Sequence, residues 1–163
     1  MTQQQESQSV ITDEMRAAIG KESDPTVMEV DKTMCRLFAR AVGHTDLIFY
    51  DEAVARQRGY RSVVAPPGFL GTPVYQPRGP QIEGEMMGRG FATPYKRVLN
   101  GGTEYEYFDT ICAGDTLTVR SKISGFSERS GSLGPMLITN RETTYTNQDG
   151  KVVAKMYGTV IQY

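Results

Sequence analysis

The fold is decided at the end of the chain, by GPMLITNRETTYT (134–146), NQDG (147–150) and KVVAKMYGTVIQY (151–163). Both long runs are rich in β-branched and aromatic residues, which favour strands. The segment between them combines Asn, Asp and Gly, the residue types that reverse a chain tightly between paired strands. This stretch therefore predicts an antiparallel β-hairpin.

Two further strand-like runs precede the hairpin. TEYEYF (103–108) alternates charged and aromatic residues, and AGDTLTVRSKI (113–123) alternates polar and apolar residues after a Gly-Asp turn. Successive side chains of a strand point to opposite faces, so Glu104 and Glu106 share one face. We expect that face to be solvated rather than to hold a pair of carboxylates for acid/base chemistry. Together with the hairpin, these runs predict about four antiparallel strands.

Helical patterns dominate the N-terminal half. TDEMRAAIG (12–20) predicts a short helix, and DPTVMEV (24–30) predicts a short strand because its proline disfavours helix. A longer helix is predicted from about residue 31 to residue 42. Its apolar residues recur at i, i+3, i+4 and i+7 and should form one buried stripe, made of Met34, Leu37, Phe38 and Ala41.

The ends of these helices are also marked in the sequence. Asp31 is suited to cap the longer helix, and Gly43 is suited to follow its last turn. DEAVARQRGY (51–60) predicts a second short helix that begins after its aspartate and stops at its glycine. Pro66 and Pro67 suit the opening of a further helix, where a missing N–H costs little.

The order of elements predicts an α+β chain, with helices grouped near one face of an antiparallel sheet. The length of 163 residues fits a single domain over residues 1–163. Residues 1–10 are polar and should form a disordered tail. Residues 76–100 begin with several glycines and prolines and predict a long loop, and such loops inside compact domains are usually functional.

Composition excludes several classes of function. With 18 basic and 19 acidic residues the net charge is −1, which gives no basic surface for nucleic acid or for a membrane. No apolar run approaches the roughly 20 residues that span a bilayer, and the N-terminus lacks the pattern of a secretory signal. Cys35 and Cys112 lie far apart, which fits a reducing, cytoplasmic setting. A single histidine argues against a zinc site.

That histidine, His44, stands in AVGHTDLIFYDEA (41–53), where Asp46 follows two residues later. A histidine beside an aspartate in a loop that leaves a helix is a candidate acid/base pair, because imidazole exchanges protons near neutral pH. The same residues also fit an ordinary connecting loop.

The chain resembles the MaoC-like hydratases and dehydratases, and more closely their dehydratase-type N-terminal branch, which is related to the dehydratase domain of fungal fatty acid synthase. The resemblance covers about residues 15–163. It rests on FARAVGHTDLIFYDEAVARQRGYRSVVAPPGFL (38–70), RVLNGGTEYEYF (97–108) with the strand that follows, and GPMLITNRETTYTNQDGKVVAKMYGTVI (134–161). It implies a hotdog fold, in which a curved antiparallel sheet wraps around a central helix.

The resemblance also implies what the chain does. Two hotdogs pair as a homodimer or as a hetero-oligomer with a second hotdog subunit, and an acyl thioester lies between them. The family adds water reversibly across the 2,3 double bond of an enoyl thioester, usually on coenzyme A, and 3-hydroxyacyl-CoA is the product. Coenzyme A belongs to the substrate, so no separate cofactor is expected. The acyl group itself does not follow from the sequence.

The family's catalytic motif reads G-D-x-N-P-x-H, and this chain departs from it. Gly43 matches the glycine, but His44 stands at the aspartate, Asp46 at the asparagine and Leu47 at the proline. Phe49 stands at the family's histidine and cannot transfer a proton. Either His44 and Asp46 form a rearranged catalytic dyad, or this chain is a non-catalytic acyl-CoA-binding subunit that supports a competent hotdog partner. A hotdog thioesterase is a third alternative, for which the sequence shows no motif.

Four residues are candidate substrate contacts. Phe49 occupies a motif position, and Gly68 matches the glycine whose N–H points at the thioester carbonyl in the family. Gly68 could instead only allow close packing of helix and sheet. Asn100 and Gly101, in RVLNGG, could approach the substrate closely or simply turn the chain.

Overall fold

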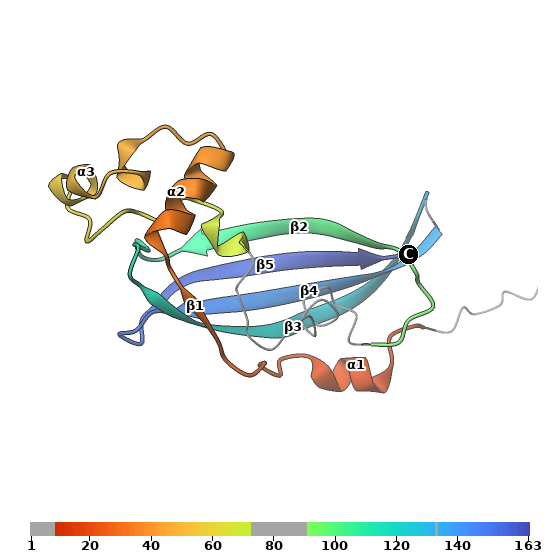
Figure 1. Ribbon diagram of the computed structural model, residues 1–163. Coiled ribbons are helices and arrows are strands. Elements are labelled where there is room, and N and C mark those ends of the chain that lie inside the picture. Colours follow the sequence, from red (N-terminus) through yellow and green to blue (C-terminus); the bar gives the residue numbers. More distant parts are fainter. Residues whose placement is uncertain (1–8, 73–90, 133) are drawn as a thin grey trace, which may run out of the picture.

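The computed structural model describes residues 9–72, 91–132 and 134–163. Within these ranges five antiparallel strands form one sheet in the order β1-β3-β4-β5-β2, and the helical segments all lie before β2 in the sequence (Figure 1). The elements along the chain are α1 (Asp13–Ala18), β1 (Thr26–Glu29), α2 (Lys32–Ala41), η1 (Leu47–Phe49), α3 (Glu52–Gln57), η2 (Phe69–Gly71), β2 (Val98–Tyr107), β3 (Thr116–Gly131), β4 (Gly134–Thr146) and β5 (Val152–Gln162).

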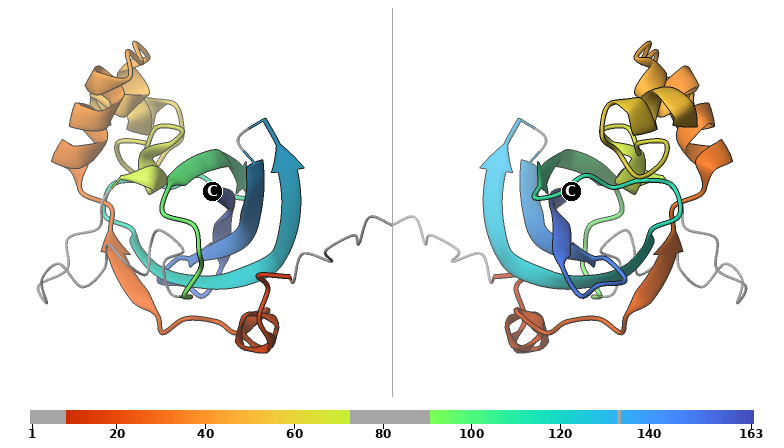
Figure 2. Two further views of the ribbon diagram at one scale, coloured as in Figure 1. Left: turned by 90° about the vertical axis from the view of Figure 1, so that its right-hand side faces the viewer. Right: turned by 90° about the vertical axis from the view of Figure 1, so that its left-hand side faces the viewer.

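The sheet is strongly curved. Figure 2 shows the long strand β3 bending around the other strands, so that the sheet has a concave face. The predicted hairpin is confirmed, because β4 pairs with β5 and the Asn147 N–H donates to the Lys151 carbonyl at 2.9 Å. The register shifts in β2, in β3 and between β4 and β5, and such bulges bend strands. This architecture is the predicted α+β hotdog fold.

The segment around η2 packs into the core of the sheet. Phe69 and Leu70 are buried together with Tyr145 and Val153, and the Tyr145 hydroxyl donates to the Leu70 carbonyl at 3.4 Å. The helix expected to open at the paired prolines is a single 3-10 turn over Phe69–Gly71. Any continuation over residues 73–90 lies outside the described residues.

The predicted apolar stripe of α2 is not its buried face. Cys35 and Ala39 are fully buried, whereas Met34 and Leu37 are 43% and 55% exposed. The helix is therefore rotated by about one residue from the orientation that hydrophobicity alone predicts. Small side chains on the buried face let the helix backbone lie close to the core, and only Phe38 of the longer apolar side chains packs against it.

The predicted helix starts are confirmed. Asp31 accepts the Met34 N–H at 2.9 Å, Asp51 accepts the Ala53 N–H at 2.7 Å, and Thr12 caps α1. Two boundaries need correction. β2 begins at Val98, so the last three residues of the expected loop over 76–100 belong to a strand, while residues 76–90 lie outside the described residues.

The second correction concerns the expected tail over residues 1–10. Of its residues the structure describes Ser9 and Val10, and both hydrogen bond to the Glu128 carboxylate of β3, at 2.9 and 2.6 Å. This end of the expected tail is therefore attached to the sheet.

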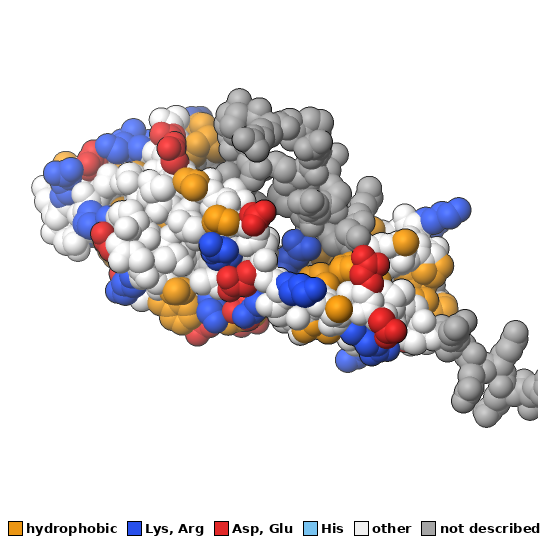
Figure 3. All heavy atoms as spheres, turned by 90° about the horizontal axis from the view of Figure 1, so that it is seen from below, with side chains coloured by type: hydrophobic (Ala, Val, Ile, Leu, Met, Phe, Trp, Pro, Cys, Tyr) orange, Lys and Arg blue, Asp and Glu red, His pale blue; other side chains and the backbone are white. Residues whose placement is uncertain are grey.

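On the face seen from below, acidic and basic side chains are interleaved, with apolar patches between them (Figure 3). On β4, Glu142 lies 2.9 Å from the Lys155 ammonium and 3.5 Å from that of Lys122. Within the described ranges, no helix has the length and apolar character to cross a membrane.

Candidate functional site

A cleft of about 490 Å³ opens where η1 and η2 meet the end of β2. Aromatic and aliphatic side chains dominate its wall. The lining consists of Ile48, Phe49, Tyr60, Val64, Ala65, Pro66, Pro67, Phe69, Leu70, Tyr107, Phe108, Asp109, Thr110 and Ile111. A cleft of this size and character suits a small ligand with an apolar part.

Backbone hydrogen bonds hold the walls of the cleft together. Val64 forms an antiparallel bridge with Cys112, and the Ala65 N–H donates to the Ile111 carbonyl at 2.9 Å. The Val64 N–H donates to the Ile48 carbonyl at 3.0 Å, which attaches η1 to the same segment. Residues 64–65 therefore link η1 to residues 111–112, two parts of the chain that are distant in sequence from each other.

Gly68 lies at the rim of the cleft, and its N–H is engaged by the protein. It donates to the Tyr107 hydroxyl oxygen at 3.0 Å. The positive φ of 86° at Gly68 is a conformation that other residues rarely adopt. A Cβ at this position would lie 3.4 Å from the Phe38 ring of α2, which is an ordinary contact, so the backbone conformation rather than close packing favours glycine here.

A second tyrosine covers the same turn. The rings of Tyr105 and Tyr107 stack at 6.0 Å between centroids and 23° between planes. A Cβ on Gly71 would lie only 2.9 Å from the Tyr105 hydroxyl oxygen, so the small residue allows this contact. Tyrosines two residues apart share a strand face, while Glu104 and Glu106 are exposed, as the alternation predicted. Neither tyrosine was predicted to be a site residue, although the alternation in TEYEYF could have located both.

The structure does not join His44 and Asp46. The Asp46 carboxylate accepts the Ile48 N–H at 3.1 Å and meets the Arg58 guanidinium at 2.8 Å. The Ile48 N–H and then Arg58 lower the pKa of Asp46. Asp46 thus caps η1 and pairs with Arg58, the C-cap residue that follows α3. Neither Asp46 nor His44 belongs to the described lining of the cleft.

His44 contacts a residue that lines the cleft but is not itself among the lining residues. Its backbone N–H donates to the Ala39 carbonyl at 2.9 Å, and its backbone carbonyl accepts a hydrogen bond from the Tyr50 hydroxyl at 2.6 Å. Its imidazole contacts the Phe49 ring, with 5.1 Å between centroids. Phe49 lines the cleft, and its contact with substrate stays a prediction. The catalytic assignment of His44 and Asp46 stays a prediction.

Asn100 and Gly101 do not form a turn. Both lie within β2, where Gly101 is the extra residue of a bulge and the Asn100 side-chain oxygen accepts the Gly102 N–H at 3.0 Å. A Cβ on Gly101 would lie 2.8 Å from the Thr159 methyl group, so close strand packing requires this glycine. The described lining of the cleft includes neither residue, and their contact with substrate stays a prediction.

Asp109 is the one carboxylate among the described residues that line the cleft. Its Oδ2 lies 2.7 Å from the Lys151 ammonium, and its Oδ1 accepts the Thr110 N–H at 2.8 Å. The hydrogen bond from Lys151 and that from Thr110 lower the pKa of Asp109. This carboxylate is therefore ionised near neutral pH, with its charge balanced by Lys151, and it is a poor proton donor.

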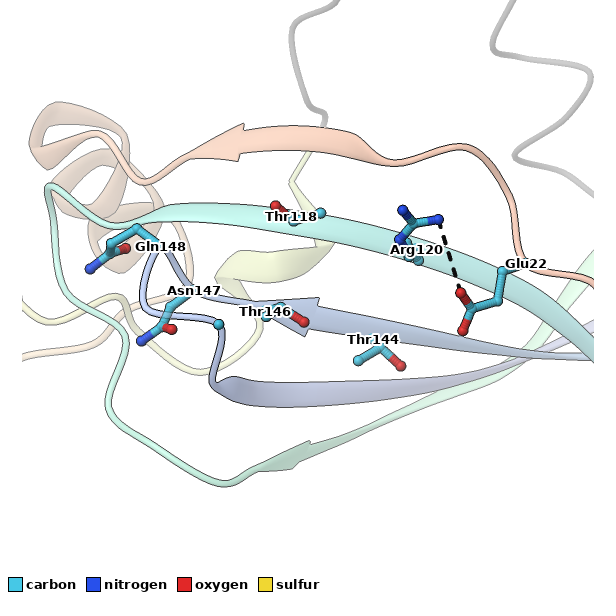
Figure 4. A pocket seen from close by; sticks show the side chains of 8 residues that line it. Glu22, Thr118, Arg120, Thr144, Thr146, Asn147 and Gln148 are labelled. Atoms are coloured by element: carbon cyan, nitrogen blue, oxygen red, sulfur yellow. Dashed lines mark ion pairs between the residues drawn. The ribbon is translucent and has the colours of Figure 1, made fainter.

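A second hollow, of about 410 Å³, lies over β3, β4 and the turn after β4 (Figure 4). Threonine hydroxyls, the side chains of Asn147 and Gln148, and the pair Arg120–Glu22 surround it. This polar lining does not suit an apolar acyl chain. Among the residues that the structure describes, no group of three His, Cys, Asp or Glu side chains could hold a metal ion. The candidate site is therefore the apolar cleft.

The curved antiparallel sheet defines the hotdog fold, and comparison with known proteins identifies the family. Residues 17–156 match the family described as FAS1-like, dehydratase domain region. The chain belongs to this family.

Named relatives and a solved structure extend the comparison. A UPF0336 protein of Streptomyces griseus is 33% identical over 115 residues, 70% of this chain and 74% of the relative. A probable enoyl-CoA hydratase alpha subunit of Thermomonospora curvata is 28% identical over 135 residues, 77% of this chain but 42% of that protein. The truncated HadBC (3R-hydroxyacyl-ACP dehydratase) complex of Mycobacterium tuberculosis is similar with a TM-score of 0.69 and 26% identity, covering 88% of this chain and 96% of the matched chain.

Proposed function

We propose that this chain is the acyl-thioester-binding subunit of a hydratase or dehydratase, and that a second hotdog subunit supplies the proton-transferring residues. The substrate would be an enoyl-CoA or 3-hydroxyacyl-CoA, with coenzyme A as part of the substrate and no further cofactor. The observation that carries the proposal is the apolar cleft, in which Phe49 occupies the position of the family's histidine.

The chemistry of hydration explains why a partner is invoked. The reaction needs a base for the water, an acid for the α-carbon and a hydrogen-bond donor for the thioester oxygen. Phe49 cannot transfer a proton, Asp46 is paired with Arg58, and Asp109 is paired with Lys151. The described cleft thus offers apolar surface and the neutral hydroxyl residues Tyr60, Tyr107 and Thr110, which suit binding better than proton transfer.

The relatives support a heteromer. One is named as an alpha subunit, and the HadBC structure is a complex. The side chains of Met34 and Leu37 on α2, exposed in the single chain, are consistent with a further subunit. A genomic neighbour that encodes a hotdog with an intact G-D-x-N-P-x-H motif would be the natural partner.

The proposal is tested by measuring binding and turnover separately. Calorimetry should detect crotonyl-CoA, or a longer or bulkier enoyl-CoA, bound to the full chain alone. Loss of the enoyl thioester absorbance should occur only when the partner is present. Failure of every enoyl-CoA to bind, both alone and with the partner, would overturn the proposal, and so would equal turnover by the chain alone.

A matched pair of variants ties binding to the cleft. Ala65 lines the cleft, and its replacement by phenylalanine should fill the space and abolish binding of enoyl-CoA. Ala53 is exposed on α3, so Ala53→Phe should leave binding unchanged. Circular dichroism would check that both variants are folded. If enoyl-CoA binds to Ala65→Phe as it does to wild type, the cleft is not the binding site.

A second candidate function is hydration by this chain alone, through His44. The contact of the His44 imidazole with Phe49 favours this function, because Phe49 itself lines the cleft. Turnover by the isolated chain that disappears in His44→Ala would support this function over the first. Turnover that survives the substitution would exclude His44 as its source.

A further inference from the structure

The Tyr107 hydroxyl has a specific place in the cleft. It stands at the end of β2, among the residues that line the cleft, and its oxygen accepts the Gly68 N–H at 3.0 Å. The ring is held from the side by the stacked ring of Tyr105. The hydroxyl oxygen is therefore fixed by one backbone contact and the ring by one neighbour, while the side chain remains 43% exposed.

The proton of this hydroxyl is available for a ligand. A tyrosine hydroxyl donates one hydrogen bond and accepts others, and here the Gly68 N–H uses the acceptor side. No acceptor for the proton occurs within the described parts of the chain. Burial raises the pKa of Tyr107, despite the opposing effect of the Gly68 N–H, so the phenol keeps its proton at neutral pH.

The hydrogen bond from Gly68 also makes the phenol a better donor. A donor that itself accepts a hydrogen bond is polarised, and neighbouring bonds in a chain strengthen one another. The Gly68 N–H, which the sequence predicted to face the thioester carbonyl, instead reaches the phenol oxygen.

We propose that Tyr107 donates the hydrogen bond that holds the carbonyl oxygen of the acyl thioester, with Gly68 supporting the phenol from behind. The proposal rests on the proposed function and adds to it the residue that recognises the thioester. The neighbouring side chains of Phe108 and Ile111 are apolar and suit the alkyl part of the acyl group. Tyr107 would then distinguish a thioester from a ligand of the same shape without a carbonyl.

The test compares two ligands that differ only in the carbonyl oxygen, butyryl-CoA and S-butyl-CoA. Their affinities for the full chain are measured by calorimetry for wild type and for Tyr107→Phe. Removing one neutral hydrogen bond should weaken butyryl-CoA roughly two- to tenfold. The affinity for S-butyl-CoA should not change. The matched control is Tyr157→Phe, since Tyr157 is similarly exposed but hydrogen bonds to Glu106 outside the cleft.

A spectroscopic measurement separates a hydrogen bond from a change of shape. In infrared difference spectra, the carbonyl stretch of bound butyryl-CoA should move to higher frequency in Tyr107→Phe, because the carbonyl loses a donor. Equal loss of affinity for both ligands, or an unchanged carbonyl stretch, would overturn the role of Tyr107. If that happens while wild type still binds butyryl-CoA, the proposed function stands. If wild type binds an enoyl-CoA but not butyryl-CoA, the same comparison is made with the saturated acyl-CoA and S-alkyl-CoA of that acyl group. If wild type binds no acyl-CoA, both alone and with the partner, both proposals fail.

Discussion

Replacing Asp115 by asparagine would test how the segments around the cleft are held together. Asp115 is only 2% exposed and follows the turn that leads into β3. Its carboxylate meets both Nη atoms of Arg61, at 2.7 and 2.9 Å, and accepts the buried Cys112 N–H at 2.9 Å. Gln148 donates a further bond at 3.3 Å. Asparagine has nearly the same shape but carries no charge, and it sets an amide N–H₂ against the guanidinium.

The contacts of Asp115 set the size of the expected effect. A hydrogen bond from a buried N–H to a charged group contributes roughly 1.5–3 kcal/mol. The Arg61 side chain is 58% exposed, so solvent screening reduces that pair to about 1 kcal/mol. We therefore expect Asp115→Asn to lower the free energy of unfolding by about 2–3 kcal/mol. In a chain of 163 residues this corresponds to a fall in Tm of about 5–10 °C.

The effect should depend on pH in a defined direction. Burial tends to raise the pKa of Asp115, but the bonds from Arg61, Cys112 and Gln148 outweigh it and lower the pKa. A carboxyl with a lowered folded pKa stabilises the protein fully above its unfolded value of about 3.9. That contribution is lost as the pH falls through the folded pKa. The difference between wild type and Asp115→Asn should therefore shrink in acid.

Urea unfolding followed by circular dichroism would measure the difference, because the chain has no tryptophan. Asp109→Asn is a matched control, since the Asp109–Lys151 pair is 42% and 59% exposed and solvent screening should leave stability nearly unchanged when it is removed. A change below about 0.5 kcal/mol for Asp115→Asn at pH 7 would refute the reasoning. So would a larger change that does not depend on pH.

Three further predictions concern single residues. Gly101→Ala should destabilise the protein by about 1–3 kcal/mol, because the new Cβ would lie 2.8 Å from a side-chain atom of Thr159. The control is Gly125→Ala, whose new Cβ meets nothing within 4 Å, and urea unfolding of both variants would show whether crowding is the cause. Burial raises the pKa of the Cys35 thiol to about 12, so a disulfide reagent at pH 8 should modify it only after unfolding, and rapid labelling of the folded chain would contradict this. Asp31→Ala removes the cap of α2 and should cost about 0.5–2 kcal/mol in thermal or urea unfolding.

Much of the fold could be predicted because its signals are local. The hairpin, the α2 cap at Asp31 and the α3 cap at Asp51 depend on residues within a few positions of one another. The buried face of α2 could not be predicted in this way. Met34 and Leu37 are more hydrophobic than Ala39, yet only the smaller residue is buried, because the close approach of the helix to the core decides which side chains fit.

The candidate site was predictable in location more than in contacts. Phe49 does line the cleft, and Gly68 lies at its rim. The partner of Gly68 was not predictable, since Tyr107 is 39 residues away and reaches it only because β2 passes η2 in the folded chain. The pairing of Asp46 with Arg58 likewise depends on α3 bringing a residue 12 positions away beside the loop.

The sequence by itself determined the strands, the helix ends and the loss of the family's histidine at Phe49, since alternation, capping and residue identity need no knowledge of distant neighbours. The tertiary structure decided which polar groups are already paired. Curvature of the sheet brings Tyr107 to Gly68, and helix packing brings Arg58 to Asp46. Such pairings depend on distances between elements, and these distances are fixed only when the core packs.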